Sequence, residues 1–487
     1  MSQTVFDLVV IGAGPGGYVA AIRGAQEGLK TAIIEGHKMG GECLNYGCIP
    51  SKALITAAHT FESIKHAQKM GIEVDRARLN MSHLVDWKDK IVKQLTGGIA
   101  QLMRANKVTS ISAFAAFSSY DPQSGIKTLS LSNGESVQAK NVIVATGSES
   151  VNLPFLPVDG KYVCSSKEAL DLREIPERII VVGGGFIGLE LGTFFMKVGA
   201  ELSVVEASPL LLPGTDRECV SVVEKKLKKQ GAQIFTNTKA LGYKKKDSMV
   251  FLDVERENGE KETLSGDLIL VTVGRKARTQ GLDLEKIGLN TTDRGFISVN
   301  ARLETSCPGV YAIGDVIGGA MLAHKASKEA LVAVDCILNP SSRMDMRALP
   351  WAIFVDPEIA VVGHSAESAK DAGWDPVESR CPFAANGRAL TTGESDGFVK
   401  LISDRKTNRL LGAHMVGPDV SNLIAEVALG IELGASAEDI ALTVHAHPTL
   451  PETIMEAAEA VHGKAIHFFD REAQQRRKEH QSHSLST

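Results

Sequence analysis

Long apolar segments and an excess of positive charge are both missing from this sequence. No hydrophobic run approaches the roughly 18 to 20 residues that cross a bilayer, and the longest ones, such as residues 269–273, are short enough to be buried strands. Lys and Arg number 53 against 58 Asp and Glu, and a formal net charge of -5 gives no attraction to a polyanion. We therefore expect neither a membrane span nor a nucleic-acid partner.

Cysteine is also scarce, and the N-terminus shows no targeting segment. Only 7 Cys occur among 487 residues, without a second matching Cys pair of the kind a zinc site needs, so no metal site is expected. Residues 1–4 lead directly into an apolar run at residues 6–11, with neither a signal peptide nor an Arg-rich transit segment. This start predicts a cytoplasmic protein of bacterial type, with a processed organellar chain as the alternative.

The chain is too long to be organised around one hydrophobic core. Hydrophobic residues make up 44% and charged residues 23%, with 46 Gly, which is typical of a soluble globular protein with many tight turns. These proportions exclude a single small binding module, a disordered chain and a fibrous architecture.

The strongest organisational signal is an internal duplication. Each copy consists of an apolar strand, a glycine-rich turn, a helix, a second strand and an acidic residue, and the copies are offset by 171 residues. In both, the acid lies 18 residues after the last glycine. The first copy contains Gly12, Gly14, Gly17 and Glu35, and the second contains Gly183, Gly185, Gly188 and Glu206.

Each copy has the residues that a βαβ nucleotide site needs. The first glycine allows a tight turn, the second lets the backbone approach a pyrophosphate, and the third lets helix and strand pack closely. The pyrophosphate then lies at the helix N-terminus, where free N–H groups favour negative charge. In the second copy the Glu206 carboxylate repels a 2′-phosphate, and no Arg or Lys follows at residues 207–210, which favours NAD over NADP.

These signals predict an α/β chain with two Rossmann-like dinucleotide-binding domains and a C-terminal α+β domain. After residue 350 the pattern changes to alternating strands and amphipathic helices. The expected parts are a first dinucleotide domain at residues 1–150, a second at 151–277, a segment returning to the first domain at 278–349, the α+β domain at 350–470 and a polar, disordered tail at 471–487.

Two cysteines follow the first glycine turn directly. Cys43 and Cys48 are separated by four residues, a spacing too wide for a thioredoxin-type motif. Because a short-loop disulfide stabilises little, a redox-active dithiol is favoured over the alternative of two reduced, buried thiols. A reacting dithiol needs a base, since only the thiolate is nucleophilic. His447, followed five residues later by Glu452, fits this role.

Segments 40–52, 305–315, 321–325 and 445–452 resemble the FAD-dependent pyridine nucleotide-disulfide oxidoreductases, and among them the dihydrolipoamide dehydrogenases. The similarity runs from about residue 5 to about residue 468 in the family's order. It implies FAD at the first glycine turn, NAD at the second, and a homodimer formed through the α+β domain. The implied reaction oxidises protein-bound dihydrolipoamide to lipoamide and reduces NAD+ to NADH. The implied partners are lipoyl-bearing acyltransferase or carrier proteins of 2-oxoacid dehydrogenase or glycine cleavage complexes.

The resemblance also implies roles for individual residues. Cys43 would exchange with the substrate, Cys48 would contact the flavin, and His447 with Glu452 would serve the cysteines of the other subunit. Lys52 and Glu190 would pair beside the flavin. The implied FAD contacts are Gly12, Gly14, Gly17, Glu35, Gly40, Gly41, Cys43, Lys52, Ala115, Thr146, Gly147, Asp315, Met321, Leu322, Ala323 and His324. The implied NAD contacts are Gly183, Gly185, Ile187, Gly188, Glu206, Ala240 and Gly274.

Two positions depart from the family pattern. Glu42 stands where a small or hydroxylic residue is common, so its carboxylate is expected to raise the thiol pKa of Cys43 or to disfavour acidic substrates. Ala115 replaces a frequent glycine, which should matter little because the contact is through backbone.

Three alternative functions fit the sequence less well. An NADPH-dependent disulfide reductase of the glutathione type needs cationic residues after Glu206, and they are missing. A mercuric reductase needs an extra cysteine pair that the C-terminal segment lacks. A flavin-binding scaffold without turnover leaves the cysteine pair, His447 and Glu452 without a purpose.

Overall fold

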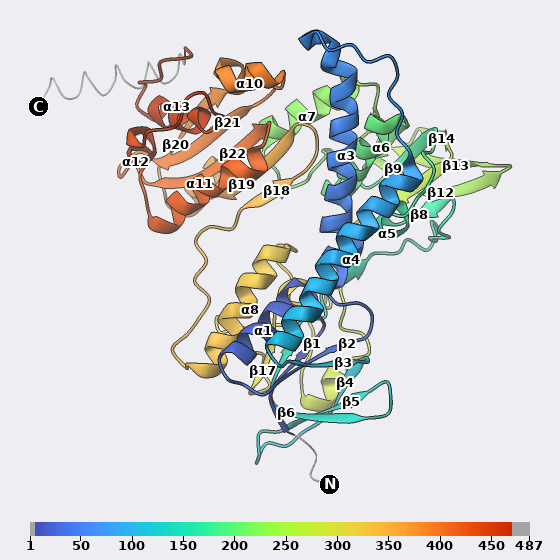
Figure 1. Cartoon of the computed structure of the whole chain (residues 1–487), viewed down its shortest axis with the longest axis vertical. Coiled ribbons are helices and arrows are strands. Elements are labelled where there is room, and N and C mark those ends of the chain that lie inside the picture. Colours follow the sequence, from blue (N-terminus) through green and yellow to red (C-terminus); the bar gives the residue numbers. More distant parts are fainter. Residues whose placement is uncertain (1–4, 470–487) are drawn as a thin grey trace, which may run out of the picture.

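Three groups of elements make up residues 5–469, the part of the chain that this computed structural model describes. The first sheet lies at the N-terminal end of the molecule, and the second sheet and the C-terminal elements lie at the opposite end (Figure 1). Helix α3 (Cys48–His66) runs between the two ends and packs on α4 (Met81–Ala105) and α6 (Phe186–Val198). The expected tail at residues 471–487 falls outside the described residues.

The first sheet is built around β1 (Val5–Ile11), a continuous apolar run. Leu8, Val9 and Val10 have no exposed surface, as expected for a strand covered on both faces. Helices α1 (Pro15–Gln26) and α8 (Ala323–Leu338) pack together over one face of the sheet. Around β1 lie β2 (Thr31–Glu35), β3 (Thr109–Ser112), β6 (Ser136–Val144) and β17 (Val310–Ala312), all parallel, followed by β5 (Lys127–Leu131) and β4 (Ala115–Tyr120), which are antiparallel.

The second sheet repeats the centre of the first. Its middle strand β9 (Arg178–Val182) pairs in parallel with β10 (Glu201–Val205) and β15 (Leu268–Val271), and β11 (Gln233–Phe235) and β8 (Val163–Cys164) lie outside them. Helices α6 and α7 (Arg217–Lys229) cover one face. The other face is covered by the antiparallel strands β12 (Thr238–Lys246), β13 (Met249–Arg256) and β14 (Lys261–Gly266).

The C-terminal elements form an antiparallel sheet with helices on one face. The strands lie in the order β18 (Trp351–Ile353), β19 (Glu358–Gly363), β22 (Leu410–Gly417), β21 (Phe398–Asp404) and β20 (Pro376–Pro382). Helices α11 (Val420–Leu433) and α13 (Glu452–Val461) cover one face, and from the other face Phe398 and Val416 join the core around α3 and α6. The predicted fold class, with two Rossmann-like parts and an α+β part, is confirmed.

Polar side chains define where several helices begin. The side chain of Asn80 accepts from the backbone at the start of α4, and Asp216 does the same for α7. The remaining elements are the helices α2 (Gly41–Tyr46), α5 (Ser166–Ala169), α9 (Ala366–Asp371), α10 (Gly387–Thr392) and α12 (Ala437–Leu442), the paired strands β7 (Ser148–Ser150) and β16 (Arg275–Ala277), and the 3-10 turns η1 (Ala67–Met70), η2 (Leu284–Ile287), η3 (Gly314–Ile317) and η4 (Phe383–Ala385).

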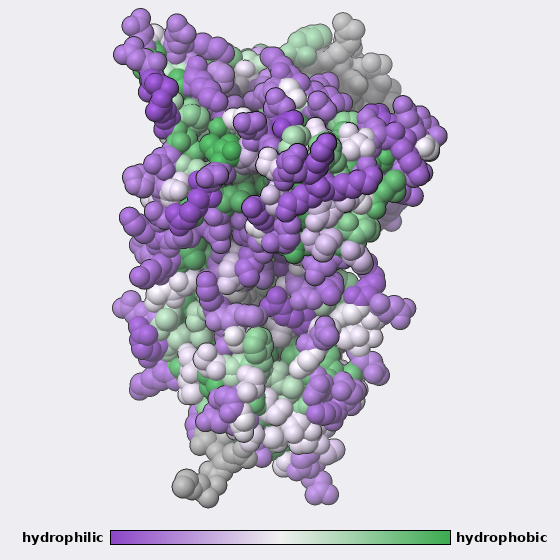
Figure 2. Space-filling view, turned by 90° about the vertical axis from the view of Figure 1, so that its right-hand side faces the viewer, coloured by the Kyte–Doolittle hydropathy of each residue, from purple (hydrophilic) through white to green (hydrophobic). Residues whose placement is uncertain are grey.

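The surface is mainly polar on the face that Figure 2 displays, with apolar side chains gathered in limited areas. Within residues 5–469, none of the helices combines the length and the apolar character that crossing a bilayer requires.

Candidate active site

One cavity brings the first glycine turn and the cysteine pair together. Its lining includes the turn after β1, the loop and helix that carry the cysteines, the end of β6, the start of α6 and the turn before α8. Strands β1 and β6 end at this edge of the sheet because they are parallel, and ligands of open α/β sheets bind at that edge. Among its lining residues are Gly12, Glu35, Cys43, Cys48, Lys52, Glu190 and Asp315.

The glycines of the first turn are each required for a different reason. Gly12 has a φ of +98°, and a Cβ there would lie 2.4 Å from the carbonyl oxygen of Ala145. A Cβ on Gly17 would lie 1.9 Å from the carbonyl oxygen of Gly12, so helix and turn touch through backbone. Gly14 lines the cavity, and a Cβ on it would meet nothing within 4 Å. The turn therefore leaves free backbone surface for a ligand at Gly14.

The second glycine turn repeats this geometry after β9. A Cβ on Gly183 would lie 2.5 Å from the Thr272 carbonyl oxygen, and one on Gly188 would lie 2.4 Å from the Gly183 carbonyl oxygen. At Gly185 a Cβ would again meet nothing within 4 Å. The duplication in the sequence thus corresponds to a repeated set of backbone contacts. In each copy the middle glycine, Gly14 or Gly185, leaves an open space that we call the cradle.

The two acidic residues are oriented in the same way. Glu35 accepts from the backbone N–H groups of Ala13, at 2.8 Å, and His37, at 2.7 Å. Glu206 accepts from those of Gly184, at 2.6 Å, and Ser208, at 2.7 Å. Each carboxylate keeps further acceptor capacity for a sugar hydroxyl, because an ionised carboxylate offers about four lone-pair sites.

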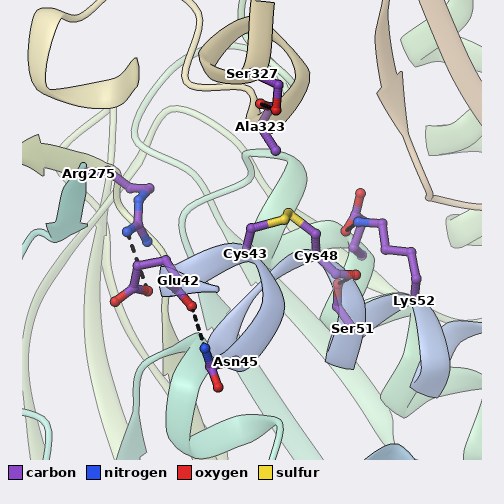
Figure 3. Close-up of a disulfide and its surroundings, with 11 residues drawn as sticks. Glu42, Cys43, Asn45, Cys48, Ser51, Lys52, Arg275, Ala323 and Ser327 are labelled. Carbon is purple, nitrogen blue, oxygen red and sulfur yellow. Dashed lines mark hydrogen bonds and ion pairs between the residues drawn. A yellow bond between two sulfur atoms is a disulfide. The ribbon is translucent and has the colours of Figure 1, made fainter. Parts of the chain in front are cut away.

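The cysteines form a disulfide within the cavity (Figure 3). Cys43 lies in α2, and Cys48 is the first residue of α3, where the helix dipole favours a thiolate after reduction. The Asn45 side chain donates to the carbonyl oxygens of Met39 and Gly41, both at 2.9 Å, and so fixes the loop that precedes Cys43. Both cysteines are half-buried, and the Ala323 side chain points toward them.

Lys52 and Glu190 form an ion pair on the side of α3 that faces α6. The Lys52 Nζ lies 2.7 Å from Glu190 Oε2, and Nζ also lies 4.4 Å from the centre of the Phe354 ring. The second carboxylate oxygen of Glu190 accepts from the backbone N–H of Phe354 at 2.9 Å. Glu190 is 5% exposed, so these contacts satisfy an almost fully buried carboxylate.

Asp315 is part of a polar chain that the sequence analysis missed. The Ser148 hydroxyl donates to Asp315, and Arg275 donates to the Ser148 hydroxyl at 2.7 Å and to its carbonyl oxygen at 2.9 Å. Ser148 follows Gly147, and Arg275 follows Gly274, which was the available sequence signal. Their contact depends on the pairing of β7 with β16, which joins residues far apart in the chain.

His447 and Glu452 are brought together, but not with the disulfide of their own chain. His447 Nδ1 lies 2.9 Å from Glu452 Oε1, and the backbone N–H of Thr449 donates to Glu452 Oε2 at 2.8 Å. The His447 side chain is 80% exposed, and neither residue is among those that line the cavity. This pair, His447 and Glu452, is called the dyad below, and its histidine lies at the surface of the C-terminal part.

The other predicted contact residues differ in their relation to the cavity. Thr146, Gly147, Gly41, Met321 and Ala323 line it, as does Ile187 from the second part. The remaining FAD candidates, which do not line it, are Gly17, Gly40, Ala115, Leu322 and His324. Ala115 is buried at the start of β4, and the backbone N–H of Ala113 nearby donates to the Glu35 carbonyl oxygen. Ala240 lies half-buried in β12, and Gly274 precedes β16 with a φ of +121°.

The comparisons with known proteins show the family. Residues 6–330 match the family described as pyridine nucleotide-disulphide oxidoreductase, and residues 349–458 match the dimerisation domain of that family. The chain belongs to the pyridine nucleotide-disulphide oxidoreductases. It is an FAD- and NAD-using oxidoreductase with a redox-active disulfide, and its dimerisation domain supports a homodimer.

Similar proteins are named dihydrolipoyl dehydrogenase. The chain is 44% identical over 465 residues to that of Geobacillus stearothermophilus, covering 95% of this chain and 97% of the relative. It is 46% identical over 468 residues to that of Thermus scotoductus, covering 96% and 99%. Among solved structures it resembles LpdA from Mycobacterium tuberculosis, with a TM-score of 0.86, 25% identity and coverage of 93% and 99%. It also resembles the HOCl-induced flavoprotein disulfide reductase RclA from Escherichia coli, with a TM-score of 0.82, 26% identity and coverage of 93% and 99%.

Proposed function

We propose that this chain oxidises protein-bound dihydrolipoamide to lipoamide and reduces NAD+ to NADH. The observation that carries the proposal is the Cys43–Cys48 disulfide in the wall of the cavity that also contains the first glycine turn. A dithiol substrate and a flavin can thus both reach the sulfur atoms. The dihydrolipoyl dehydrogenase name shared by relatives over nearly the whole chain supports the same substrate.

FAD fits the residues of this cavity. The open cradle at Gly14 suits a pyrophosphate, Glu35 suits the adenosine ribose, and Asp315 suits the ribityl hydroxyls. The Lys52 and Glu190 pair would lie beside the flavin ring. When bound, FAD supplies the two-electron chemistry that links the dithiol to NAD+.

NAD fits the second turn for the same physical reasons. Gly185 offers open backbone surface, and Glu206 is held with its carboxylate toward that turn. Within residues 207–210 there is no cation to hold a 2′-phosphate, so NAD+ is the expected acceptor rather than NADP+. Ile187 lines the flavin cavity from the N-terminal turn of α6, where it would separate the two ligands.

The residues of this chain carry out the thiol exchange. A dihydrolipoamide thiolate attacks the Cys43 sulfur, which breaks the Cys43–Cys48 bond and leaves Cys48 as a thiolate. His447 takes the proton of the attacking thiol at Nε2, because Nδ1 is engaged by Glu452. The second substrate thiol then attacks the mixed disulfide, so that lipoamide leaves with one S–S bond and the enzyme holds the two electrons as a dithiol.

The homodimer completes the site. His447 is exposed and does not line its own disulfide cavity, so we assign it to the cysteines of the partner subunit. The C-terminal part also exposes large apolar side chains that suit a subunit interface, namely Leu429, Leu433, Leu442 and Val444. The lipoyl group would arrive on a carrier protein of a 2-oxoacid dehydrogenase or glycine cleavage complex.

We also propose a cytoplasmic location. The cysteines other than Cys43 and Cys48 are all free and buried, as is usual in a reducing compartment.

The test is NADH formation by the purified flavoprotein with dihydrolipoamide and either NAD+ or NADP+. A parallel reaction contains glutathione disulfide and NADPH. Rapid turnover with NAD+ and dihydrolipoamide alone is the expected result. Turnover only with NADPH and glutathione disulfide would contradict both the substrate and the nucleotide assignment.

A further inference from the structure

Glu42 is the acidic residue directly before the disulfide cysteine Cys43. Its carboxylate lies 3.5 Å from Arg275 Nη2, a contact drawn in Figure 3. The same carboxylate lies 3.6 Å from Arg278 Nη2. All three residues line the cavity that contains the disulfide. The side chain of Glu42 is 40% exposed, so its charge acts in a partly screened environment.

The arginine closer to Glu42 is fixed independently of it. Arg275 is 15% exposed and donates two hydrogen bonds to Ser148, so it would keep its place if Glu42 were neutral. Arg278 has a second carboxylate neighbour, Glu149, with 3.7 Å between Nε and Oε2. Glu149 is not among the residues that line the cavity.

The remaining charged residues in the cavity wall make their contacts with groups other than Glu42. Lys52 pairs with Glu190, Lys38 lies over the Tyr46 ring, and Glu35 is bound by backbone N–H groups. Asp315 accepts from Ser148, and His37 and the phenol of Tyr46 are the other titratable groups in the wall besides the cysteines. Arg275 and Arg278 are therefore the cations of the wall that the Glu42 carboxylate neutralises.

We infer that Glu42 is a positioning residue that offsets the positive charge of Arg275 and Arg278 at the disulfide and so keeps the reduced dithiol from being over-stabilised. The inference rests on the redox-active disulfide of the proposed function. Reduction breaks the S–S bond and adds two electrons, and the product carries one thiol and one thiolate after one proton has been taken up. Uncompensated guanidinium groups favour that thiolate, because opposite charges attract.

The loop does not need Glu42 for its shape. Asn45 holds the residues before Cys43 through two backbone carbonyl groups, and Gly41 packs against Gly14, where its Cβ would lie 2.6 Å from the Gly14 Cα. The variant Glu42→Gln also keeps the side-chain length and one oxygen for Arg275. A changed dithiol–disulfide equilibrium in this variant would thus result from the lost charge and not from a different loop conformation.

The experiment equilibrates the flavin-loaded enzyme with buffers of reduced and oxidised glutathione and counts free thiols by alkylation and mass spectrometry. We expect Glu42→Gln to shift the equilibrium about threefold toward the dithiol. This corresponds to a midpoint potential that is ~14 mV more positive for this two-electron couple. Arg278→Gln should shift it in the opposite direction. The matched control is Glu149→Gln, which removes a carboxylate of similar exposure from the same arginine, and from Lys276, but outside the cavity wall. It should shift the equilibrium less than Glu42→Gln does.

A second readout separates a charge effect from a structural one. The rate of Cys43 alkylation in the reduced enzyme, followed against pH, should move to lower pH in Glu42→Gln and stay in place in Glu42→Asp. The difference should shrink at high salt, since exposed charges are screened. If the midpoint potential of the disulfide in Glu42→Gln is unchanged or more negative than in the wild type, the inference is wrong. The wild-type enzyme would still oxidise dihydrolipoamide in that case. Failure of the wild-type enzyme to oxidise dihydrolipoamide would instead overturn the proposed function.

Discussion

At the scale of single residues, the contacts around Glu452, the carboxylate of the dyad, lower its pKa. Burial acts to raise the pKa of Glu452, but hydrogen bonds from the Thr449 N–H and from His447 outweigh it and hold this pKa below its usual value. The carboxylate is therefore ionised well into the acidic range. It holds His447 with Nε2 free to accept a proton.

The variant His447→Gln tests this arrangement. We expect turnover with dihydrolipoamide to fall by roughly 10²- to 10⁴-fold, the usual contribution of a general base. Steady-state kinetics of NADH formation give the measurement, and a loss smaller than tenfold would show that another group accepts the proton.

At the scale of elements, the two glycine turns differ in ligand but not in geometry. Gly14 and Gly185 have φ values of -68° and -75°, which any residue adopts, and a Cβ at either meets nothing within 4 Å. Alanine at these positions should therefore leave the fold intact. It should act only on the ligand that occupies each cradle.

This predicts a matched pair of phenotypes. Gly14→Ala should weaken FAD binding by roughly five- to 150-fold, since an overpacked contact costs about 1–3 kcal/mol. Gly185→Ala should keep the flavin and raise the KM for NAD+. Flavin absorbance per protein after desalting, together with the KM, distinguishes them, and flavin loss in Gly185→Ala would contradict the assignment of the two turns.

A buried ion-pair group joins α6 and α7 to the turn before β19. Lys197 Nζ lies 2.8 Å from Asp356 Oδ2 and 2.9 Å from Glu62 Oε2, and Lys226 Nζ lies 2.6 Å from Asp356 Oδ1. Burial acts to raise the pKa of Asp356, but the two lysines outweigh it and lower this pKa. The stabilisation that ionised Asp356 provides is thus fully present above the ordinary aspartate pKa. It is lost as pH falls through the lowered pKa of Asp356 in the folded protein.

We expect Asp356→Asn to lower the free energy of unfolding by about 3 kcal/mol at neutral pH, because Lys197 is only 5% exposed and loses a carboxylate partner. The difference from the wild type should shrink as pH falls below about 4. Urea unfolding at several pH values measures this difference.

The control is Asp7→Asn, which removes the surface pair with Lys140 and should lower the free energy of unfolding by less than about 1 kcal/mol. A pH-independent loss in Asp356→Asn would show that packing rather than charge is responsible.

At the scale of the whole molecule, the presented dyad and the cavity belong to different parts of the chain. Subunits carrying Cys48→Ser and subunits carrying His447→Gln should each form inactive homodimers. In a heterodimer, the intact cysteines of one subunit meet the intact histidine of the other. Random association makes half of the dimers heterodimers with one complete site, so about a quarter of the wild-type activity should return. No recovery in co-expressed, co-purified heterodimers would place His447 at the cysteines of its own subunit.

The sequence predicted those features that depend on local spacing. The duplicated turns with Glu35 and Glu206, and the order of helices and strands around them, follow from glycine positions and apolar runs. The Ser148–Arg275 contact and the place of Phe354 at Glu190 did not follow, because they arise from strand pairing and docking between distant segments. The effect of Glu42 was open for the same reason: Arg275 and Arg278 lie far from it in the chain and beside it in space.

The contact between Glu190 and the Phe354 backbone also bears on the order of events during synthesis. Lys52, Glu190 and Phe354 leave the ribosome in that order, and Glu190 has only one of its two partners until residue 354 has emerged. A nascent chain that ends earlier keeps a carboxylate oxygen unpaired at what becomes a buried position. The Glu190 carboxylate can therefore gain its full set of partners only late in translation, after the strand that ends just before Phe354 has been made.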